Sequence, residues 1–518
     1  MWSADPPGPP PGRFDWPPPD PRSFAGTHRP YRAAYVFAIL LPLILIGLLA
    51  APIGIALALR PPAQNAGGRS ASTAGQPGVD DPYYPDAGSS GYDATRYEIV
   101  LNWDPGGQVL TATTTIQARA LQPLASFYVD LALQAERVTV NGKDATFAKQ
   151  GFADLRITPA DPIPADSEFT VVVRYSGAPG SISRGDVHPW AAKGQEWIVA
   201  GEPESAPWWF PSDDHPSDPA LMDISVRVPT GLQVVSIGRL ESKDTANEAG
   251  FDTWHWVSRQ PLATYLAFLA IGRFELVEGV ADQRPYVYAV SMQLPAADRA
   301  KILAQLEKSA AIVRVLESMF GAYPFSELGG IVPVHRFWFG GLETQTRPVY
   351  LAQSILNEEY APSLITHELS HMWFGDNVTV KQWNDIFDNE AYGSWAQWGY
   401  DERTGGAPAD EALDGYYERT KDNRNFWRIT MIDPGRDHLF DAVYTRGPMV
   451  LQALRNRIGD AAFFDLARSW SQHPGSRSLE DWMAAAQTET TIDLRPFFQA
   501  WIYAPVAPAR TAENGFRV

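Results

Sequence analysis

Residues 367–395 read HELSHMWFGDNVTVKQWNDIFDNEAYGSW and carry the most specific pattern in the chain. It opens with His367 and His371, and no Gly or Pro interrupts residues 363–374, so this part predicts a helix. Side chains four positions apart lie on one helix face, so both imidazoles can reach a single metal ion. Glu368, between them in sequence, is placed to take a proton from a water at that metal.

A catalytic zinc site needs three protein ligands and one open position. The third His of the metzincins is absent, because Phe374 and Asn377 stand where that class has Gly and His. A carboxylate from a second helical stretch, around Trp395, is the remaining common solution. Asp376 is excluded as this ligand, because it is too close in sequence to the histidines to fold back to the metal. The residues alone leave three candidates open: Asp385, Asp388 and Glu390.

The whole stretch resembles the zinc-binding core of the gluzincin aminopeptidases, the family of aminopeptidase N and of the leukotriene epoxide hydrolase. In that family the third ligand is a Glu with 18 residues between it and the second His, which here is Glu390. The resemblance therefore implies that His367, His371 and Glu390 hold one zinc ion per chain. It also implies that Glu368 is the general base.

An upstream motif extends this resemblance. Residues 340–344, Gly-Gly-Leu-Glu-Thr, are similar to the family's Gly-x-Met-Glu-Asn motif, with Leu and Thr in place of Met and Asn. The resemblance implies that Glu343 binds the free α-amine of a peptide. The backbone of Gly340 and Gly341 would align that peptide as an added strand. Outside this context, Glu343 would be read as a solvated surface carboxylate.

Two further residues are assigned by resemblance. A second amine-binding Glu of the family matches the stretch 199–204, where Glu202 fits the spacing better than Glu204. Tyr444 begins Tyr-Thr-Arg-Gly, which resembles the family's Tyr-x-x-Gly element, and a Tyr hydroxyl can donate to the oxyanion of a tetrahedral intermediate. Without these motifs, any one of the 20 Tyr is read as a packing residue.

Around this core, the sequence predicts an α+β multidomain chain. From Tyr97 to about Glu275 apolar residues alternate, as at Ile99 and Leu101, and Asn141-Gly142 is a hairpin signal, so residues 91–275 are expected to form an antiparallel β domain of sandwich or saddle type. After Pro295 the apolar spacing becomes three and four up to Phe320, and Gly321 is expected to cap that helix at its C-terminus. Residues 276–510 are therefore expected to be a mainly helical domain, thermolysin-like by resemblance, followed by a short tail (511–518) and no C-terminal helical domain.

The N-terminal part predicts a membrane anchor. Residues 1–32 are Pro-rich, residues 33–59 carry no charge over 27 positions, and residues 60–90 have the composition of a flexible linker. Four Arg precede the apolar run, which favours a cytoplasmic N-terminus. The expected location is the cell membrane of a bacterium, with one transmembrane signal anchor, in preference to a cleaved signal peptide, and an extracytoplasmic catalytic domain.

The composition of the chain excludes some classes of binding partner and of metal site. Of the formal net charge of −18, residues 1–60 contribute five Arg and three Asp, so the rest of the chain carries −20, which argues against nucleic acid. The chain has no Cys, so it has neither disulfides nor a thiolate metal site.

The predicted enzyme is a hydrolase, a membrane-anchored zinc metalloprotease that removes N-terminal residues from peptides. Two alternatives stay open: a zinc endopeptidase or non-peptide hydrolase with an open cleft, and a catalytically silent peptide-binding ectodomain.

Overall fold

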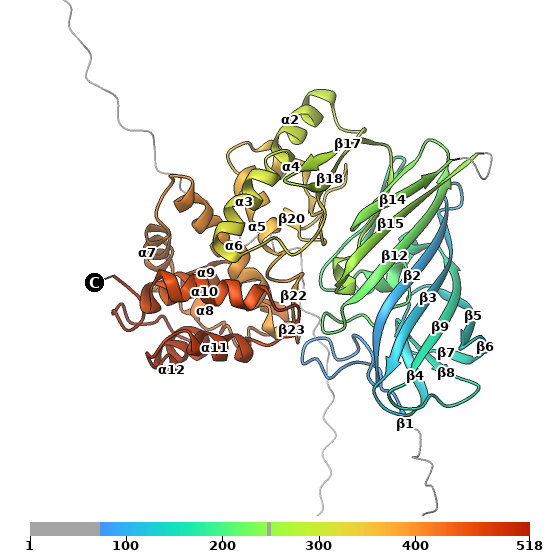
Figure 1. Cartoon of the computed structure of the whole chain (residues 1–518), viewed down its shortest axis with the longest axis horizontal. Helices are drawn as coiled ribbons and strands as arrows, with labels where there is room; N and C mark the ends of the chain where they lie inside the picture. Colours follow the sequence, from blue (N-terminus) through green and yellow to red (C-terminus); the bar gives the residue numbers. More distant parts are fainter. Residues whose placement is uncertain (1–72, 246–249, 518) are drawn as a thin grey trace, which may run out of the picture. The chain divides into compact units, whose positions relative to one another are not determined.

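Alternating buried and exposed residues build the first half of the chain into an eight-stranded sheet (Figure 1). In its central strand β2, the side chains of Tyr97, Ile99, Leu101 and Trp103 are all buried, as the period of two predicts. Strands β12 and β2 pair in parallel and the other neighbours pair antiparallel. In spatial order the strands are β14 (Arg239–Asp244), β15 (Phe251–Leu262), β12 (Ala220–Pro229), β2 (Tyr92–Asp104), β3 (Val109–Ala120), β9 (Glu168–Gly177), β5 (Gln134–Val140) and β6 (Lys143–Asp144).

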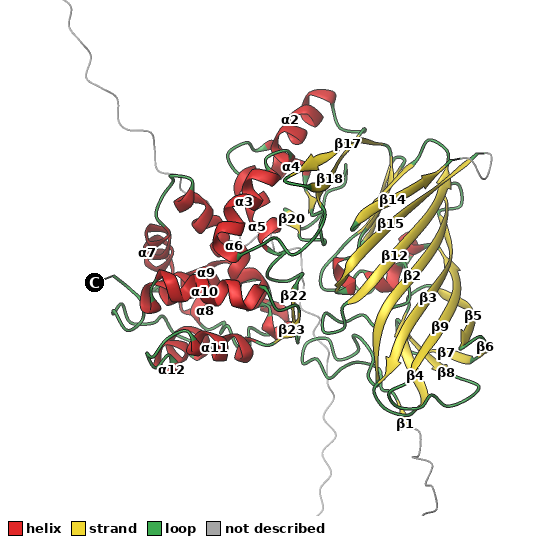
Figure 2. Ribbon diagram, viewed as in Figure 1, coloured by secondary structure: helices red, strands yellow, loops and turns green. Residues whose placement is uncertain are grey.

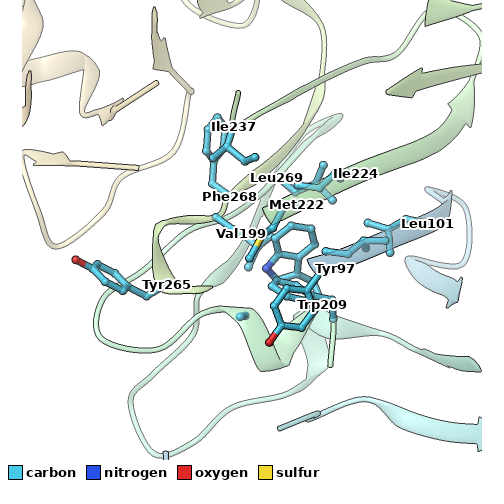
Figure 3. Close-up of a cluster of buried hydrophobic side chains, with 14 of the residues drawn as sticks. Tyr97, Leu101, Val199, Trp209, Met222, Ile224, Ile237, Tyr265, Phe268 and Leu269 are labelled. Carbon is cyan, nitrogen blue, oxygen red and sulfur yellow. The ribbon is translucent and has the colours of Figure 1, made fainter. Parts of the chain in front are cut away.

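Two four-stranded sheets complete the β half. One consists of β1 (Thr73–Ala74), β4 (Leu124–Asp130), β8 (Asp154–Thr158) and β7 (Thr146–Lys149); the other consists of β10 (Trp190–Lys193), β11 (Glu196–Val199), β16 (Leu269–Gly272) and β13 (Gln233–Ser236). Figure 3 shows part of the buried core of this half, where Trp209, Met222 of β12 and Leu269 of β16 lie close together. Asn141 and Gly142 join β5 to β6 with φ of 50° and 76°, which confirms the predicted hairpin turn.

A five-stranded sheet connects this half to the helices. Its order is β17 (Phe274–Ala281), β18 (Arg284–Ser291), β19 (Leu328–Val332), β21 (Val349–Tyr350) and β20 (Gly341–Leu342), which makes β20 an edge strand. A small parallel pair, β22 (Val378–Val380) with β23 (Gly475–Arg477), lies within the helical half. The predicted domain boundary between residues 275 and 276 falls inside β17.

Helices dominate after residue 295, as predicted, and Figure 2 shows them gathered apart from the long strands. Gly321, with φ of 89°, ends α3 as the expected C-terminal cap. The helices are α2 (Ala296–Leu306), α3 (Ser309–Phe320), α4 (Ala352–Leu356), α5 (Ala361–Ser370), α6 (Phe387–Arg403), α7 (Ala409–Thr420), α8 (Arg424–Trp427), α9 (Val443–Ile458), α10 (Asp460–Ser471), α11 (Leu479–Thr488) and α12 (Arg495–Phe498).

The computed structural model describes residues 73–245 and 250–517, and these belong to one unit of the chain. The predicted tail (1–32), the predicted span (33–59) and the first part of the predicted linker (60–90) lie outside the described residues. The rest of that linker is described and carries contacts: β1 pairs with β4, and the Asp81 carboxylate accepts the backbone N–H of Trp383.

The predicted fold class requires one correction, which concerns the transmembrane helix. Within the described ranges no helix is long and apolar enough to cross a membrane. The longest of them, α6, has 17 residues and includes five charged side chains, and at 1.5 Å per residue it extends roughly 26 Å, less than the hydrocarbon core of a bilayer. The predicted location in the cell stays a prediction.

Candidate active site

Two helices bring the three predicted metal ligands together. His367 lies in the last turn of α5 and His371 caps that helix, while Glu390 lies in the first turn of α6. The Nε2 atoms of His367 and His371 lie 3.2 and 3.6 Å from Oε2 of Glu390. Gly393, one turn further along α6, allows this approach, because a Cβ there would lie 2.8 Å from the His367 ring and 2.9 Å from His371 Nε2.

The state of these three side chains fits a zinc ion. Oε2 of Glu390 is buried and, apart from the two nearby imidazole Nε2 atoms, has no hydrogen-bonding group beside it in the described part of the chain, although a buried carboxylate oxygen normally accepts a hydrogen bond. Burial lowers the pKa of His367 to about 4, so its ring is neutral and can donate a lone pair to a metal. Nδ1 of His371 lies 3.0 Å from the Phe374 carbonyl oxygen, which orients Nε2 toward Glu390.

The other carboxylates that the sequence left open have different surroundings. Asp385 accepts the backbone N–H groups of Gln382 and Leu479, so it fixes the entry to α6 and the start of α11. Asp388 is buried with no hydrogen-bond partner in the part of the chain that the structure describes, and burial beside Asp385 raises its pKa well above the ordinary value. Neither belongs to a group of side chains that could share a metal ion among the described residues.

Glu368 lies beside the three predicted ligands. Its side chain is buried, and burial raises its pKa well above that of a free Glu, with the nearby carboxylates of Glu343 and Glu390 adding to the shift. An oxygen of Glu368 also lies close to Glu343 and His371. Gly341 packs directly on this carboxylate, since a Cβ at that position would overlap it. A glycine is therefore required at this point of β20.

Strand β20 positions the predicted peptide-aligning residues. Gly341 pairs with Tyr350 of β21, and the Gly340 carbonyl accepts the Leu351 N–H at 2.9 Å. Because β20 is the edge strand of its sheet, its second side has no strand partner in residues 73–245 and 250–517. An edge of this kind, next to Glu368, can accept an extended peptide through main-chain hydrogen bonds.

The two predicted amine-binding carboxylates are brought together from different halves of the chain. Glu343 follows β20 and Glu202 follows β11, and both are buried. Burial raises the pKa of Glu202 well above its ordinary value, and the Glu343 carboxylate is the next largest cause. Oε1 of Glu202 has no hydrogen-bond partner in the described structure. Glu204, by contrast, pairs with Arg184 at 3.1 Å.

Tyr444 lies in the first turn of α9 and contacts two of the predicted metal ligands. Its hydroxyl donates a hydrogen bond to Oε1 of Glu390 at 3.0 Å, and its ring centroid lies 5.9 Å from that of His367. Gly447, three residues later, packs against Ala391 so closely that a Cβ on it would lie 2.7 Å from the Ala391 Cβ. This contact holds α9 against α6 and keeps Tyr444 within reach of Glu390.

Two residues near this site were not identified from the sequence. Tyr265, in a 3₁₀ turn of the β half, donates to the Glu343 carboxylate at 3.3 Å. Asp376, rejected as a metal ligand, is buried, neither of its oxygens has a hydrogen-bond partner in residues 73–245 and 250–517, and burial together with Glu343 and Glu368 raises its pKa. No spacing signal marks either residue, because Tyr265 meets Glu343 only through tertiary packing and Asp376 follows a turn at Gly375 with φ of 125°.

The described residues also line a cavity elsewhere. It has a volume of about 640 Å³ on the eight-stranded sheet, and its lining includes Arg96, Asp223 and His255. Its charged groups pair with one another, as Arg96 does with Asp223, so they leave no convergent set of reactive side chains. The candidate active site is therefore the group around α5, α6 and β20.

Comparison with known proteins supports the predicted family resemblance. Residues 304–501 match the family described as the peptidase family M1 domain. Aminopeptidase N of Streptomyces lividans is 25% identical over 443 residues, which cover 79% of this chain and 50% of that protein. Aminopeptidase N of Acetobacter pasteurianus is 24% identical over 318 residues, covering 58% of this chain and 88% of that protein. The chain thus spans about half the length of the Streptomyces relative.

Among solved structures, the M1 zinc metallopeptidase of Deinococcus radiodurans is similar to this chain with a TM-score of 0.74 and 25% identity, covering 83% of this chain and 98% of that one. A mutant of that enzyme has been solved with a Tyr-Ser-Ala substrate. These findings confirm the predicted resemblance to the aminopeptidase N-like gluzincins and zinc as the metal that the site takes.

Proposed function

We propose that this zinc metallopeptidase of family M1 is an aminopeptidase, which removes residues from the N-terminus of peptides. The observation that carries the proposal is the pair of buried carboxylates, Glu202 and Glu343, next to the predicted zinc ligands. Two buried carboxylates that face each other without a cation are electrostatically unfavourable. The α-ammonium group of a peptide supplies the missing positive charge and explains why both residues are kept in one place.

The roles of the chain's own residues follow from their positions. His367, His371 and Glu390 would hold zinc, which when bound polarises a scissile carbonyl and lowers the pKa of water at the site toward about 7. Glu368 takes the proton of the attacking water and later delivers it to the leaving amine, so a carboxylate whose pKa is raised by burial suits both steps. Tyr444 donates its hydroxyl hydrogen to the oxyanion of the substrate.

Strand β20 provides the orientation of the peptide. An extended peptide that pairs with the free edge at Gly340 and Gly341 passes Glu368 along its length, and its N-terminus ends at Glu343. Because the ammonium is fixed at the carboxylate pair, the bond that reaches Glu368 is set by distance from the N-terminus. The Tyr-Ser-Ala complex of the Deinococcus relative supports a peptide as the substrate class.

The test uses the purified chain with one equivalent of zinc, incubated with Tyr-Ser-Ala and with longer peptides, each in free and N-acetylated form. Mass spectrometry should show stepwise loss of single N-terminal residues from the free peptides and no cleavage of the acetylated ones. Internal cuts in both forms would replace the proposal with an endopeptidase. Bound zinc without any cleavage would replace it with a peptide-binding protein or a hydrolase of other substrates.

A further inference from the structure

The hydroxyl of Tyr265 connects Glu343 to the helix that carries Glu390. It donates to Oε1 of Glu343 at 3.3 Å and accepts from Nδ2 of Asn389 at 3.4 Å. Tyr265 has only 2% of its surface exposed. Figure 3 shows it at the margin of the apolar cluster of the β half, with its hydroxyl directed away from the other labelled side chains. A buried phenol in this position serves more than packing.

The direction of the two hydrogen bonds is set by chemistry. An amide nitrogen can only donate, so Asn389 occupies an acceptor position of the Tyr265 oxygen. The single hydroxyl hydrogen is then left for the Glu343 carboxylate. Among the described residues, Tyr265 is the only side chain that donates to Glu343, and this bond lowers the carboxyl pKa against the larger opposite effect of burial.

Hydrogen bonds to the backbone hold in place the segment that carries Tyr265 and the segment that carries Glu343. Ser205 donates to the Tyr265 carbonyl at 3.5 Å, and the backbone N–H of Gln345, two residues after Glu343, donates to the Leu266 carbonyl at 3.3 Å. The Tyr265 ring also packs edge-on against Trp383, with centroids 5.2 Å apart. The phenol therefore cannot turn away from Glu343 without breaking contacts in both halves of the chain.

We propose that Tyr265 is a positioning residue for the amine-binding site: its hydroxyl holds the Glu343 carboxylate in one rotamer, oriented toward Glu202. This inference deepens the proposed function and rests on it. Tyr265 does not touch the scissile bond, so its loss weakens recognition of the substrate ammonium in the ground state and the transition state alike. Such a loss raises KM and leaves kcat almost unchanged.

The variant that tests this is Tyr265→Phe, which removes one oxygen and keeps the ring. The matched control is Tyr175→Phe, because Tyr175 is a fully buried Tyr of the same half whose hydroxyl donates to the Trp209 carbonyl at 2.9 Å, away from Glu343. Glu343→Gln and the double variant Glu343→Gln/Tyr265→Phe complete a double-mutant cycle, which measures the coupling between the two side chains. Thermal unfolding of each variant measures the structural cost of the lost hydroxyl.

For Tyr265→Phe we expect KM for free Tyr-Ser-Ala to rise about tenfold, which corresponds to about 1.4 kcal/mol, with kcat within about threefold of the wild type. Tyr175→Phe should leave both constants unchanged. In the Glu343→Gln background the Tyr265 substitution should add less than about twofold, because the carboxylate it positions is gone. Wild-type KM in Tyr265→Phe, or full additivity in the double variant, would overturn the inference.

Calorimetric binding of L-tryptophan and N-acetyl-L-tryptophan gives a second readout that needs no turnover. Tyr265→Phe should weaken the binding of L-tryptophan about tenfold and leave the binding of the acetylated form unaffected. Equal losses of affinity for both ligands would mean a general structural effect and would also overturn the inference about Tyr265. If the wild type binds L-tryptophan but cleaves no peptide, the proposed function fails and the binding arm alone decides the role of Tyr265. If it binds neither ligand, both proposals fail.

Discussion

The hydroxyl of Tyr444 lies 3.0 Å from Oε1 of Glu390 and donates a hydrogen bond to it, while Oε2 of the same carboxylate faces the two histidines and accepts no hydrogen bond from the described residues. One carboxylate therefore divides its two oxygens between a hydroxyl from α9 and the predicted metal position. This arrangement fixes the orientation of Glu390 and keeps the Tyr444 oxygen close to the place where substrate charge would develop.

Replacement of Tyr444 by Phe should lower kcat by about 100- to 1,000-fold, because one donor to the oxyanion is lost. KM should change little, and the zinc content should stay near one per chain, since Glu390 keeps Oε2 and both histidines remain. The measurement is steady-state kinetics together with elemental analysis of the variant. Loss of zinc in parallel with activity would instead assign Tyr444 to metal binding.

Glu368→Gln tests the general base. Gln has nearly the same shape but cannot take a proton, so turnover should fall by at least about 1,000-fold while zinc and free-amine ligands still bind. The close packing of Gly341 on this side chain makes the isosteric change preferable to Ala, which would leave a void there. Activity within tenfold of the wild type would rule out Glu368 as the proton acceptor.

Glu204 lies two residues after Glu202 and serves as a control for the predicted amine-binding role of Glu202. Glu202→Gln should raise KM for free peptides about tenfold or more, because an ionised acceptor for the substrate ammonium is lost. Glu204→Gln should not, since Glu204 pairs with Arg184 instead. Kinetics of both variants on the same free peptide measure the contrast. A similar rise in KM for both variants would mean that changes in the loop around residues 202–204, and not the loss of the Glu202 carboxylate, weaken substrate binding.

Removal of zinc should affect stability as well as activity. Without a cation, the buried carboxylates of Glu202, Glu343, Glu368 and Glu390 repel one another, so the metal-free chain should unfold at a lower temperature. Above the dissociation constant, each tenfold increase in free zinc should stabilise the folded chain by about 1.4 kcal/mol. Calorimetry of chelated and zinc-titrated protein checks this, and His367→Ala should show no such increase.

Local patterns predicted the elements of the fold but not the contacts between its halves. The period of two around Ile99, the turn at Asn141-Gly142 and the cap at Gly321 depend on neighbours in sequence, and all three are confirmed. The position of the two histidines on one helix is also a local property. The choice of Glu390 over Asp385 and Asp388 needed the family resemblance, because all three precede or begin the same helix.

Long-range packing explains what the sequence did not reveal. Tyr265 meets Glu343 across 78 positions, from a 3₁₀ turn that no spacing signal links to the metal helices. Asp376 is predicted to be too close in sequence to His371 to fold back as a metal ligand, and no group of described side chains that could hold a metal includes it. The chain turns at Gly375, which has a positive φ, and the Asp376 carboxylate is buried near Glu343 and Glu368. The contact between Tyr265 and Glu343 forms only when the two halves pack, whereas the burial of Asp376 depends on the backbone turn at Gly375.

Asp214 predicts a pH dependence of stability that is separate from catalysis. It is buried and accepts the Thr264 hydroxyl at 2.6 Å, and burial raises its pKa to about 7. The folded state therefore keeps this proton up to about pH 7, whereas the unfolded chain releases it near pH 3.8. The contribution of Asp214 to the free energy of unfolding is full below about pH 4 and is lost as the pH rises to about 7.

Asp214→Asn removes this dependence, because the amide stays neutral and its oxygen still accepts the Thr264 hydroxyl. Relative to the wild type, the variant should gain up to about 4 kcal/mol between pH 4 and pH 8, from about 1.4 kcal/mol per pKa unit. Urea unfolding at pH 4.5, 6 and 8 measures the difference, with Asp161→Asn as the exposed control that makes the same charge change. A gap between variant and wild type that stays constant with pH would mean that Asp214 is ionised in the folded chain, with its charge balanced by neighbouring groups such as Arg184.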